Sequence, residues 1–345
     1  MRPERPDLSS LAPEVRAYIE HLEAELQRLE RAPRRSQPTL EPSEPPTTVN
    51  VITGTTQGRI KRTPRHLYVR QRRGGMGVFG MESGEEDWPA FLILADEGDR
   101  FVVITDRGRG FSLPVAELPE SPLHSRGDAL SRWLPLQEGE RPQLLLPVTA
   151  KAVLYLVSAR GWVRRLGGNI IANLKPGTML HVRPDELPVA ACWGSGGDHL
   201  FVATAQGKAI RFSERQVPVK GGCLALRLDP GDEAVAVTTV PEEGGVFLMG
   251  KDGKGTIRLM RGFRANKAPG AGGKQAMKTA GLVGAAQVTE QDDIFAISHL
   301  GKVIRFAAAE VPAKEGVVQG VNCMALRRDE VSALAVSPAP GNPDS

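Results

Sequence analysis

Residues 71–77, with the sequence Gln-Arg-Arg-Gly-Gly-Met-Gly, carry the clearest chemical signal in the chain. An arginine side chain is a planar donor that can give two hydrogen bonds to one phosphate group. Glycine lets the backbone approach a ligand closely and adopt positive φ angles. Between residues 49 and 80 there is no Asp or Glu at all. The segment therefore predicts contact with a phosphate-bearing polymer, although a basic run alone also fits a solvated surface.

Length and composition are typical of a globular protein. The chain has 345 residues, of which 41% are hydrophobic and 24% charged, and its formal net charge is +4. The first 48 residues hold seven Arg and nine Asp or Glu, so the basic excess lies in the rest of the chain. No apolar run approaches the roughly 20 residues that span a bilayer, and the first residues lack the apolar core of a signal peptide. We expect a cytoplasmic protein without a membrane partner.

Cysteine and histidine usage argues against a metal site. The three cysteines, Cys192, Cys223 and Cys323, form no CxxC pair, which fits a reducing compartment. The six histidines show no ligand spacing such as HxxxH. We therefore expect neither a disulfide framework, nor a bound metal, nor a cofactor.

Two segments precede the main domain. Within residues 1–32, Ser9 or Ser10 can cap a helix in which apolar residues recur at steps of four and three, namely Val15, Ile19, Leu22, Leu26 and Leu29. We expect residues 10–30 to pair two copies of the chain in a short coiled coil or to dock on a partner; packing on the main domain is the alternative. Residues 33–48 are rich in proline and predict a disordered tether. We expect residues 339–345 to form a disordered tail.

From residue 49 the chain repeats six times. Each unit has an alternating apolar strand, a turn with glycine, and a second strand with an anchor residue four positions after that glycine, in sequence order Arg62, Ser112, Arg165, Arg211, Arg258 and Arg305. The fifth copy is irregular, because Arg258 is one step too close to Gly255 or one too far from Gly253. A second landmark, seven residues after the anchor, is Pro119, Pro218 or Pro312. Six strand-rich units predict an all-β, propeller-like domain over residues 49–338.

These residues resemble the C-terminal domain of the bacterial DNA gyrase A protein, which is a six-bladed β-pinwheel. The repeat Thr-x-x-Gly-x-x-x-Arg with a downstream aliphatic-Pro is similar to the blade signature of that family. Residues 71–77 match its gyrase-A box, Q-R-R-G-G-K-G, at six of seven positions. The resemblance implies a pinwheel that binds and wraps double-stranded DNA around its rim. It also implies that the box holds DNA and joins the first and last blades.

Two departures from the family are informative. Met76 replaces the box lysine and removes one positive charge, so we expect reduced but not abolished wrapping. The catalytic half of the gyrase A protein has no counterpart: Tyr18, Tyr68 and Tyr155 lack an Arg-Tyr-Thr setting, and the stretch before Lys274 is not a phosphate-binding loop of an ATPase. We expect a non-enzymatic protein with no catalytic residues and no small-molecule substrate.

The candidate DNA-binding residues are the glycines and polar residues of the box and the basic residues of four repeats. They are Arg59, Lys61, Arg62, Arg65, Arg70, Gln71, Arg72, Arg73, Gly74, Gly75, Gly77, Arg164, Arg165, Lys208, Lys254, Arg258, Arg261, Arg264, Lys267, Lys274 and Lys278. Residues 269–281, rich in Gly and Ala, predict a mobile loop. The anchors Arg211 and Arg305 fit either DNA contact or packing between blades.

Three functions remain open at this point. The first is a free-standing, nucleoid-associated DNA-wrapping protein, architectural or accessory to a topoisomerase. The second is a separately encoded C-terminal part of a split gyrase A protein, or of its topoisomerase IV counterpart, which would act in trans on a catalytic partner. The third is a propeller that serves as a protein-binding scaffold. The low aromatic content of 5% argues against a reader of single strands, which relies on stacking.

Overall fold

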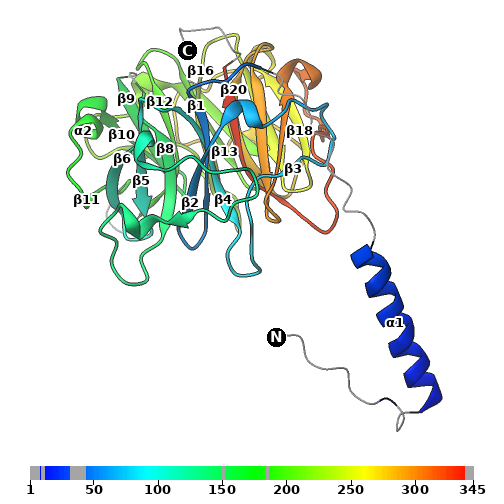
Figure 1. Cartoon of the computed structure of the whole chain (residues 1–345). Coiled ribbons are helices and arrows are strands. Elements are labelled where there is room, and N and C mark those ends of the chain that lie inside the picture. Colours follow the sequence, from blue (N-terminus) through cyan, green and yellow to red (C-terminus); the bar gives the residue numbers. More distant parts are fainter. Residues whose placement is uncertain (1–7, 9–11, 32–43, 150–151, 184–185, 339–345) are drawn as a thin grey trace. The chain divides into compact units, whose positions relative to one another are not determined.

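Six mainly antiparallel sheets, each centred on one sequence repeat, form the larger part of the molecule (Figure 1). The computed structural model describes residues 8, 12–31, 44–149, 152–183 and 186–338. The chain divides into two units, residues 1–41 and 42–345. The predicted all-β, six-bladed fold is confirmed for the second unit. The predicted tail, residues 339–345, lies outside the described residues.

The strands of the first three blades follow a common order from the inside of the ring to its rim. Blade 1 consists of β4 (Pro89–Asp96), β1 (Val49–Thr55), β2 (Arg59–Pro64) and β7 (Asp128–Ala129). Blade 2 consists of β8 (Pro142–Pro147), β5 (Arg100–Thr105), β6 (Arg109–Pro114) and β11 (Thr178–Met179). Blade 3 consists of β12 (Pro188–Gly194), β9 (Val153–Ser158), β10 (Trp162–Gly167) and β15 (Cys223–Leu224).

The other three blades repeat this order. Blade 4 consists of β16 (Ala234–Val240), β13 (His199–Thr204), β14 (Lys208–Ser213) and β19 (Lys274–Gln275). Blade 5 consists of β20 (Leu282–Val288), β17 (Gly245–Gly250) and β18 (Lys254–Leu259), with β23 (Ala313–Lys314) and β24 (Val321–Asn322) both paired to β18. Blade 6 consists of β25 (Val331–Ser337), β21 (Asp293–Ser298), β22 (Lys302–Ala307) and β3 (Val78–Phe79).

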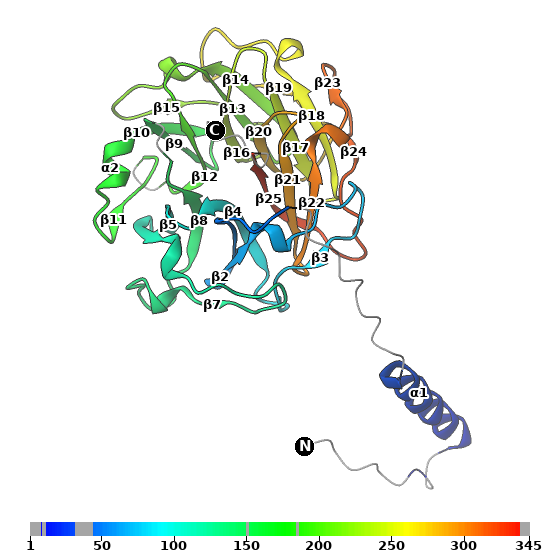
Figure 2. The same ribbon diagram turned by 45° about the horizontal axis from the view of Figure 1, so that its top comes forward.

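Each blade receives its outermost strand from the next repeat along the chain. A segment with one helical turn links the second strand of a repeat to this donated strand. These segments contain η1 (Arg65–Leu67), η2 (Val115–Glu117), α2 (Gly168–Ala172), η4 (Glu214–Gln216), η5 (Met260–Gly262) and η6 (Ala308–Glu310); a further turn, η3 (Leu130–Arg132), follows β7. Blade 6 is formed by the last repeat of the chain, and it receives its outer strand, β3, from the first repeat. The donated strands lie at the periphery of the disk in Figure 2.

The ring is closed. The innermost strands contact one another in the circular order β4, β8, β12, β16, β20, β25 and back to β4. One cluster of buried apolar side chains fills each of the six seams between blades. The seam between blades 6 and 1 holds Tyr68 edge-to-face on Phe295, with ring centroids 6.2 Å apart. Burial of apolar area at every seam is the main stabilising contribution to such a ring.

The glycine turns between the first two strands of each blade explain the repeat signature, and they show which residue is the anchor of the fifth repeat. Gly58, Gly108, Gly161, Gly207, Gly253 and Gly301 all have positive φ between the first two strands of their blades. The fifth turn glycine is therefore Gly253. The register of blade 5 pairs Phe247 with Ile257, as blade 4 pairs Phe201 with Arg211. Ile257, not Arg258, occupies the anchor position of the fifth repeat.

A buried ion network joins residue 44 to the seam between blades 6 and 1. Glu44 accepts hydrogen bonds from Arg65 Nε at 3.0 Å and from Arg305 Nη2 at 2.7 Å. Burial alone would raise the pKa of Glu44, but the hydrogen bonds and charges of Arg305 and Arg65 outweigh burial, so this pKa lies below its ordinary value. The predicted tether over residues 33–48 is wrong for its last residues, because Glu44 belongs to this network of the propeller; residues 33–43 lie outside the described residues.

The helix of the first unit is α1, Pro13–Arg31. Its predicted caps, Ser9 and Ser10, lie outside the described residues. Val15 and Leu22 are 47% and 45% exposed. The side chains of Leu26 and Leu29 also lie outside the described set. In the part of the chain that the structure describes, no helix has both the length and the apolar character needed to cross a bilayer.

We expect Glu44→Gln to lower the free energy of unfolding by about 2–3 kcal/mol at pH 7, because it leaves two buried guanidinium groups without one carboxylate partner. The folded-state pKa of Glu44 is depressed, so its contribution is complete above the unfolded-state pKa and is lost as pH falls through the folded-state pKa. Urea unfolding of both proteins between pH 7 and pH 3 should therefore show the difference shrinking toward low pH.

Glu97→Gln is the matched control. Glu97 pairs with Arg62 at 2.9 Å, but its side chain is 50% exposed. Loss of this pair should change stability by at most about 0.5 kcal/mol. Equal effects of the two substitutions would show that Glu44 is not a structural part of the seam.

Candidate nucleic-acid interface

The box loop, residues 71–77, runs along the last repeat and joins it to the first. Gln71 N donates to Arg305 O at 2.7 Å, and Gly74 N donates to Cys323 O at 2.7 Å. The chain then continues as β3, which pairs Val78 with Val303 and Phe79 with Lys302 of β22. The box loop therefore closes the ring by main-chain hydrogen bonds.

Gly77 is the glycine of the box loop that this closure requires. Gly77 has a φ of +73°, and a Cβ atom there would lie 2.6 Å from the carbonyl oxygen of Val303. A Cβ atom on Gly75 would lie 2.8 Å from Oε1 of Gln71. Gly74 also has positive φ. Gly77 permits the close approach of two backbones. Ring closure therefore explains this glycine without a bound ligand.

The two box arginines have different surroundings. Arg73 donates from Nε to Glu310 O at 2.7 Å and from Nη1 to Asn322 O at 3.1 Å, which fixes the loop to the sixth repeat. The side chain of Arg72 is exposed, and the backbone of this residue accepts a bond from Gly75 N. Met76 is 52% exposed. Arg72 and residue 76 are therefore the box positions whose side chains face solvent.

Three basic residues of blade 1 that were predicted to bind DNA are buried. Nζ of Lys61 donates to the carbonyl oxygens of Pro122 and Leu123, at 2.8 and 2.6 Å, and burial lowers the pKa of Lys61 to about 8. Arg62 and Arg65 are only 7% and 4% exposed. Lys61 holds the loop of the second repeat against blade 1, Arg62 pairs with Glu97, and Arg65 belongs to the Glu44 network. We leave them out of the proposed DNA surface.

Other predicted cations are paired with acidic residues. Arg59 lies 3.7 Å from Asp87, Arg70 lies 2.8 Å from Asp293, and Arg261 lies 2.6 Å from Glu315. Lys208 pairs with Asp229, and Lys254 lies 3.5 Å from Asp252. These ion pairs reduce the net positive charge that the residues present to a phosphate.

The remaining predicted residues fall into a structural and an exposed group. Arg258 is 5% exposed, and Arg164 donates to His181 O at 2.9 Å; Arg165 is half-buried on β10. The exposed group is Arg264, Lys267, Lys274 and Lys278 of the fifth repeat. Lys274 lies on β19, so the span predicted as a mobile loop over residues 269–281 in fact provides the outer strand of blade 4.

The alternative left open for two anchor residues is resolved by their contacts. Nη1 of Arg211 donates to Met260 O at 3.0 Å and to Phe263 O at 3.1 Å in the next repeat. Nη1 of Arg305 donates to Tyr68 O at 3.1 Å across the closing seam. Both arginines are 1% exposed. They connect blades and do not face a nucleic acid.

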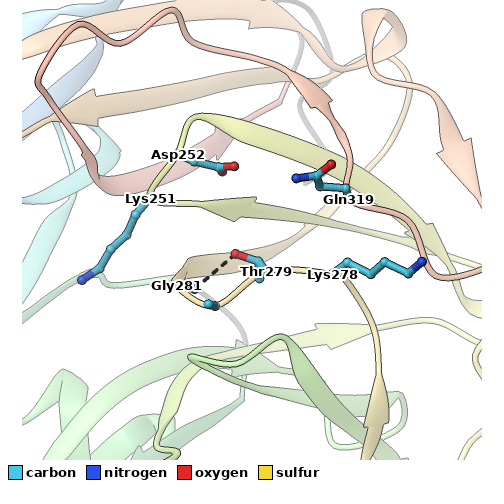
Figure 3. A pocket seen from close by; sticks show the side chains of 7 residues that line it. Lys251, Asp252, Lys278, Thr279, Gly281 and Gln319 are labelled. Carbon is cyan, nitrogen blue, oxygen red and sulfur yellow. Dashed lines mark hydrogen bonds between the residues drawn. The ribbon is translucent and has the colours of Figure 1, made fainter.

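An open pocket of about 480 Å³ lies in blade 5 (Figure 3). Its lining consists of Lys251, Asp252, Lys278, Thr279, Ala280, Gly281 and Gln319. The ammonium groups of Lys251 and Lys278 point away from each other, so they do not converge on one ligand. Among the described residues, no group of three or more His, Cys, Asp or Glu could hold a metal ion.

Sequence reasoning missed two exposed lysines on the rim, Lys220 and Lys314. Both lie nine positions after the anchor of their repeat, where the first repeat has Gln71. Aligning the six repeats at this position would have identified them.

A family model described as the DNA gyrase C-terminal domain, beta-propeller, matches residues 50–87, 99–127, 198–241 and 292–315. The chain is 29% identical over 300 residues to the DNA gyrase A protein of Escherichia coli K12, an alignment that covers 81% of this chain and 33% of that protein. It is 28% identical over 303 residues to the corresponding protein of Kosmotoga olearia, with 83% and 37% covered. The chain spans about a third of the length of these relatives.

Solved structures show the same fold. A DNA gyrase A C-terminal domain aligns with a TM-score of 0.75 at 20% identity, covering 84% of this chain and 99% of the other. The C-terminal domain of a DNA topoisomerase IV aligns with a TM-score of 0.59 at 17% identity, covering 85% and 94%. Both similarities concern the fold of the chain and extend over most of its length.

We expect Gly77→Ala to open the joint between the first and last repeats, because its methyl group would collide with the backbone of Val303. The stability cost should be about 2 kcal/mol or more. Hydrogen–deuterium exchange should accelerate at residues 71–81 and on β22, while β9 and β10 of the opposite side stay protected. Gly84→Ala is the control, since no atom lies within 4 Å of a Cβ atom there. Unchanged exchange at residues 71–81 in Gly77→Ala would contradict the closing role.

Proposed function

Because its six blades carry the fold and repeat of the DNA gyrase A C-terminal domain, we propose that this chain binds double-stranded DNA along its rim and bends it without reading its sequence. The observation that supports this most directly is the set of exposed cations on the segments that lead to the donated outer strands. Arg72, Lys220, Arg264 and Lys267 lie on such segments, and Lys314 lies on the donated strand β23. The similarity concerns the C-terminal domain of the gyrase A protein, so the proposal includes no chemical step.

Binding of this kind is electrostatic. Each Lys or Arg that neutralises a phosphate releases condensed counterions, and the free energy of this release offsets the cost of bending the duplex. Arg72 and Lys267 lie on segments that cross blades 6 and 4, so one duplex that contacts both has to follow a curved surface. Curvature and a series of cations together favour bending over contact at a single point.

The helix α1 is proposed to pair two chains or to dock on a partner. Its apolar residues follow the seam spacing of a coiled coil, and Val15, Tyr18 and Leu22 expose apolar surface. A single helix of this length is marginal in water, so burial of this face against another helix would stabilise it.

Action together with the catalytic part of a topoisomerase is the second candidate. It is favoured by the coverage of the relatives, since the matched region is only a third of each gyrase A protein. Co-purification with such a catalytic partner, and an increase in its supercoiling rate on addition of this chain, would support action in trans. A chain that leaves this rate unchanged while it wraps DNA would favour an architectural role.

Wrapping is tested by relaxing a plasmid with a nicking-closing enzyme in the presence of the chain. We expect the linking number to shift in proportion to bound protein at low salt, because each bound chain would constrain part of a superhelical turn. The sign of the shift gives the hand of the wrap. An unchanged linking number, together with retardation in a gel, would limit the function to binding. Absence of retardation at about 50 mM salt, where electrostatic binding is strong, would favour a protein-binding scaffold.

Substitutions in the box loop separate its DNA contact from ring closure. Arg72→Ala should weaken binding to unrelated sequences about equally and lower the slope of log affinity against log salt by about 0.9. Met76→Lys adds a charge at an exposed position and should raise both quantities. Arg160→Ala, which removes an exposed charge from the turn between β9 and β10, is the control and should have little effect. If Arg160→Ala weakened DNA binding as much as Arg72→Ala, the effect would follow net charge alone. That outcome would argue against a DNA contact at the box.

A further inference from the structure

The rim segments of four repeats cross the neighbouring blade in the same register. Ser121 N donates to Arg62 O at 2.8 Å, as Gln71 N does to Arg305 O, and Asn266 N donates to Arg211 O at 2.6 Å. In the sixth repeat, Ala313 pairs in parallel with Ile257, as Glu120 does with Arg62. These segments can therefore be compared residue by residue, at positions fixed by backbone hydrogen bonds and not by sequence similarity.

The comparison shows that the charge on the rim changes from blade to blade. On blade 6 the register positions hold Arg70 and Arg72. On blade 4 the position of Arg72 is taken by Lys267, and on blade 5 the position of Gln71 is taken by Lys314. The sequence repeat places Lys220 on the segment that crosses blade 3. Four consecutive blades, 3 to 6, thus carry cations at the rim.

Blade 1 interrupts this series. The position of Arg70 is taken there by Glu120, and the position of Arg72 by Pro122. Glu117 of the same segment is also exposed, as is Glu120. Among the described residues, neither carboxylate is in an ion pair. By contrast, Glu315 on blade 5 is paired with Arg261 at 2.6 Å. The segment also carries one exposed cation, Arg126, so its two carboxylates leave the rim of blade 1 with a net negative charge toward an approaching phosphate.

Blade 2 lies beyond this interruption and offers little to DNA. The segment that crosses it contains α2 and one cation, Lys175. It also exposes apolar side chains, Ile170 at 44% and Met179 at 52%.

We propose that DNA follows a partial arc over the rims of blades 3, 4, 5 and 6 and leaves the ring at blade 1, where Glu117 and Glu120 repel it. This inference rests on the proposed DNA binding and specifies its path. A duplex that circled all six blades would have to bring its phosphates past two unpaired carboxylates. A duplex that leaves at blade 1 avoids them and keeps the contact at Arg72 on blade 6.

Glu120→Arg tests where the path ends. Asn50 takes the place in blade 1 that Asp293, the partner of Arg70, takes in blade 6, so an arginine at position 120 would have no such carboxylate partner. We expect tighter DNA binding, a salt slope steeper by about one to two units, and a longer segment protected from nuclease. Glu243→Arg is the control, because it makes the same charge change in the turn between β16 and β17.

A second matched pair tests the extent of the arc. Lys267→Ala, on blade 4, should weaken DNA binding and lower the salt slope by about 0.9. Lys175→Ala, on blade 2, should leave both unchanged. Circular dichroism and thermal unfolding of each variant should match the parent chain, since all four positions are exposed.

Three results would overturn the partial arc. The first is an equal gain in Glu120→Arg and Glu243→Arg, which would show an effect of net charge alone. The second is no gain in Glu120→Arg while the parent chain binds DNA. The third is an equal loss in Lys175→Ala and Lys267→Ala, which would place DNA on blade 2. A parent chain that does not bind DNA at all would remove the proposed function itself and the arc with it.

Discussion

The pairing of β3 with β22 is the interaction on which the rest of the structure depends. Every blade borrows its outer strand from the next repeat, so the last blade is incomplete until the first repeat supplies a strand. The strand pairing itself comprises two residue pairs, and main-chain hydrogen bonds from Gln71, Gly74 and Gly80 to the last repeat extend it. It is reinforced by the apolar cluster between blades 6 and 1, and by Arg305, which binds Tyr68 O and Glu44. Without it, this cluster and one edge of β22 would be exposed to solvent.

The same side-chain type serves two purposes in this ring. Arg211 and Arg305 are buried and donate to backbone carbonyl groups of the next repeat, as Lys61 does in blade 1. A guanidinium group tolerates burial because its donors can reach several acceptors at once. Cations two to five residues beyond the helical turns, such as Arg72, Arg264 and Lys314, are instead exposed at the rim. Burial therefore separates the cations that hold blades together from those that can meet a phosphate.

The sequence repeat was sufficient to predict the number of blades, and the resemblance to the gyrase A C-terminal domain implied the junction at residues 71–77. A glycine turn followed by an anchor residue recurs at a similar spacing in all six repeats, as expected of similar blades arranged in a ring. Gly77 lies where the backbones of the first and last repeats meet closely. The sequence could not show which cations are buried. Alternation of apolar and polar residues along a strand predicts which side of the sheet a side chain lies on, but not which loop covers that side. Lys61 is covered by residues from the second repeat. Glu44 meets Arg305, a residue 261 positions away, which no local pattern reveals.

The departure from the family's heptapeptide can be interpreted from this geometry. Gly75 and Gly77 are constrained by neighbouring atoms, and Gln71, Arg73 and Gly74 donate hydrogen bonds to the last repeat. Met76, which stands where that heptapeptide has lysine, is half-exposed. The box loop thus combines a structural part, which tolerates little change, with exposed side chains at positions 72 and 76 whose charge can vary independently. Replacing the lysine by Met76 alters the electrostatic potential of the rim and leaves the closed ring intact.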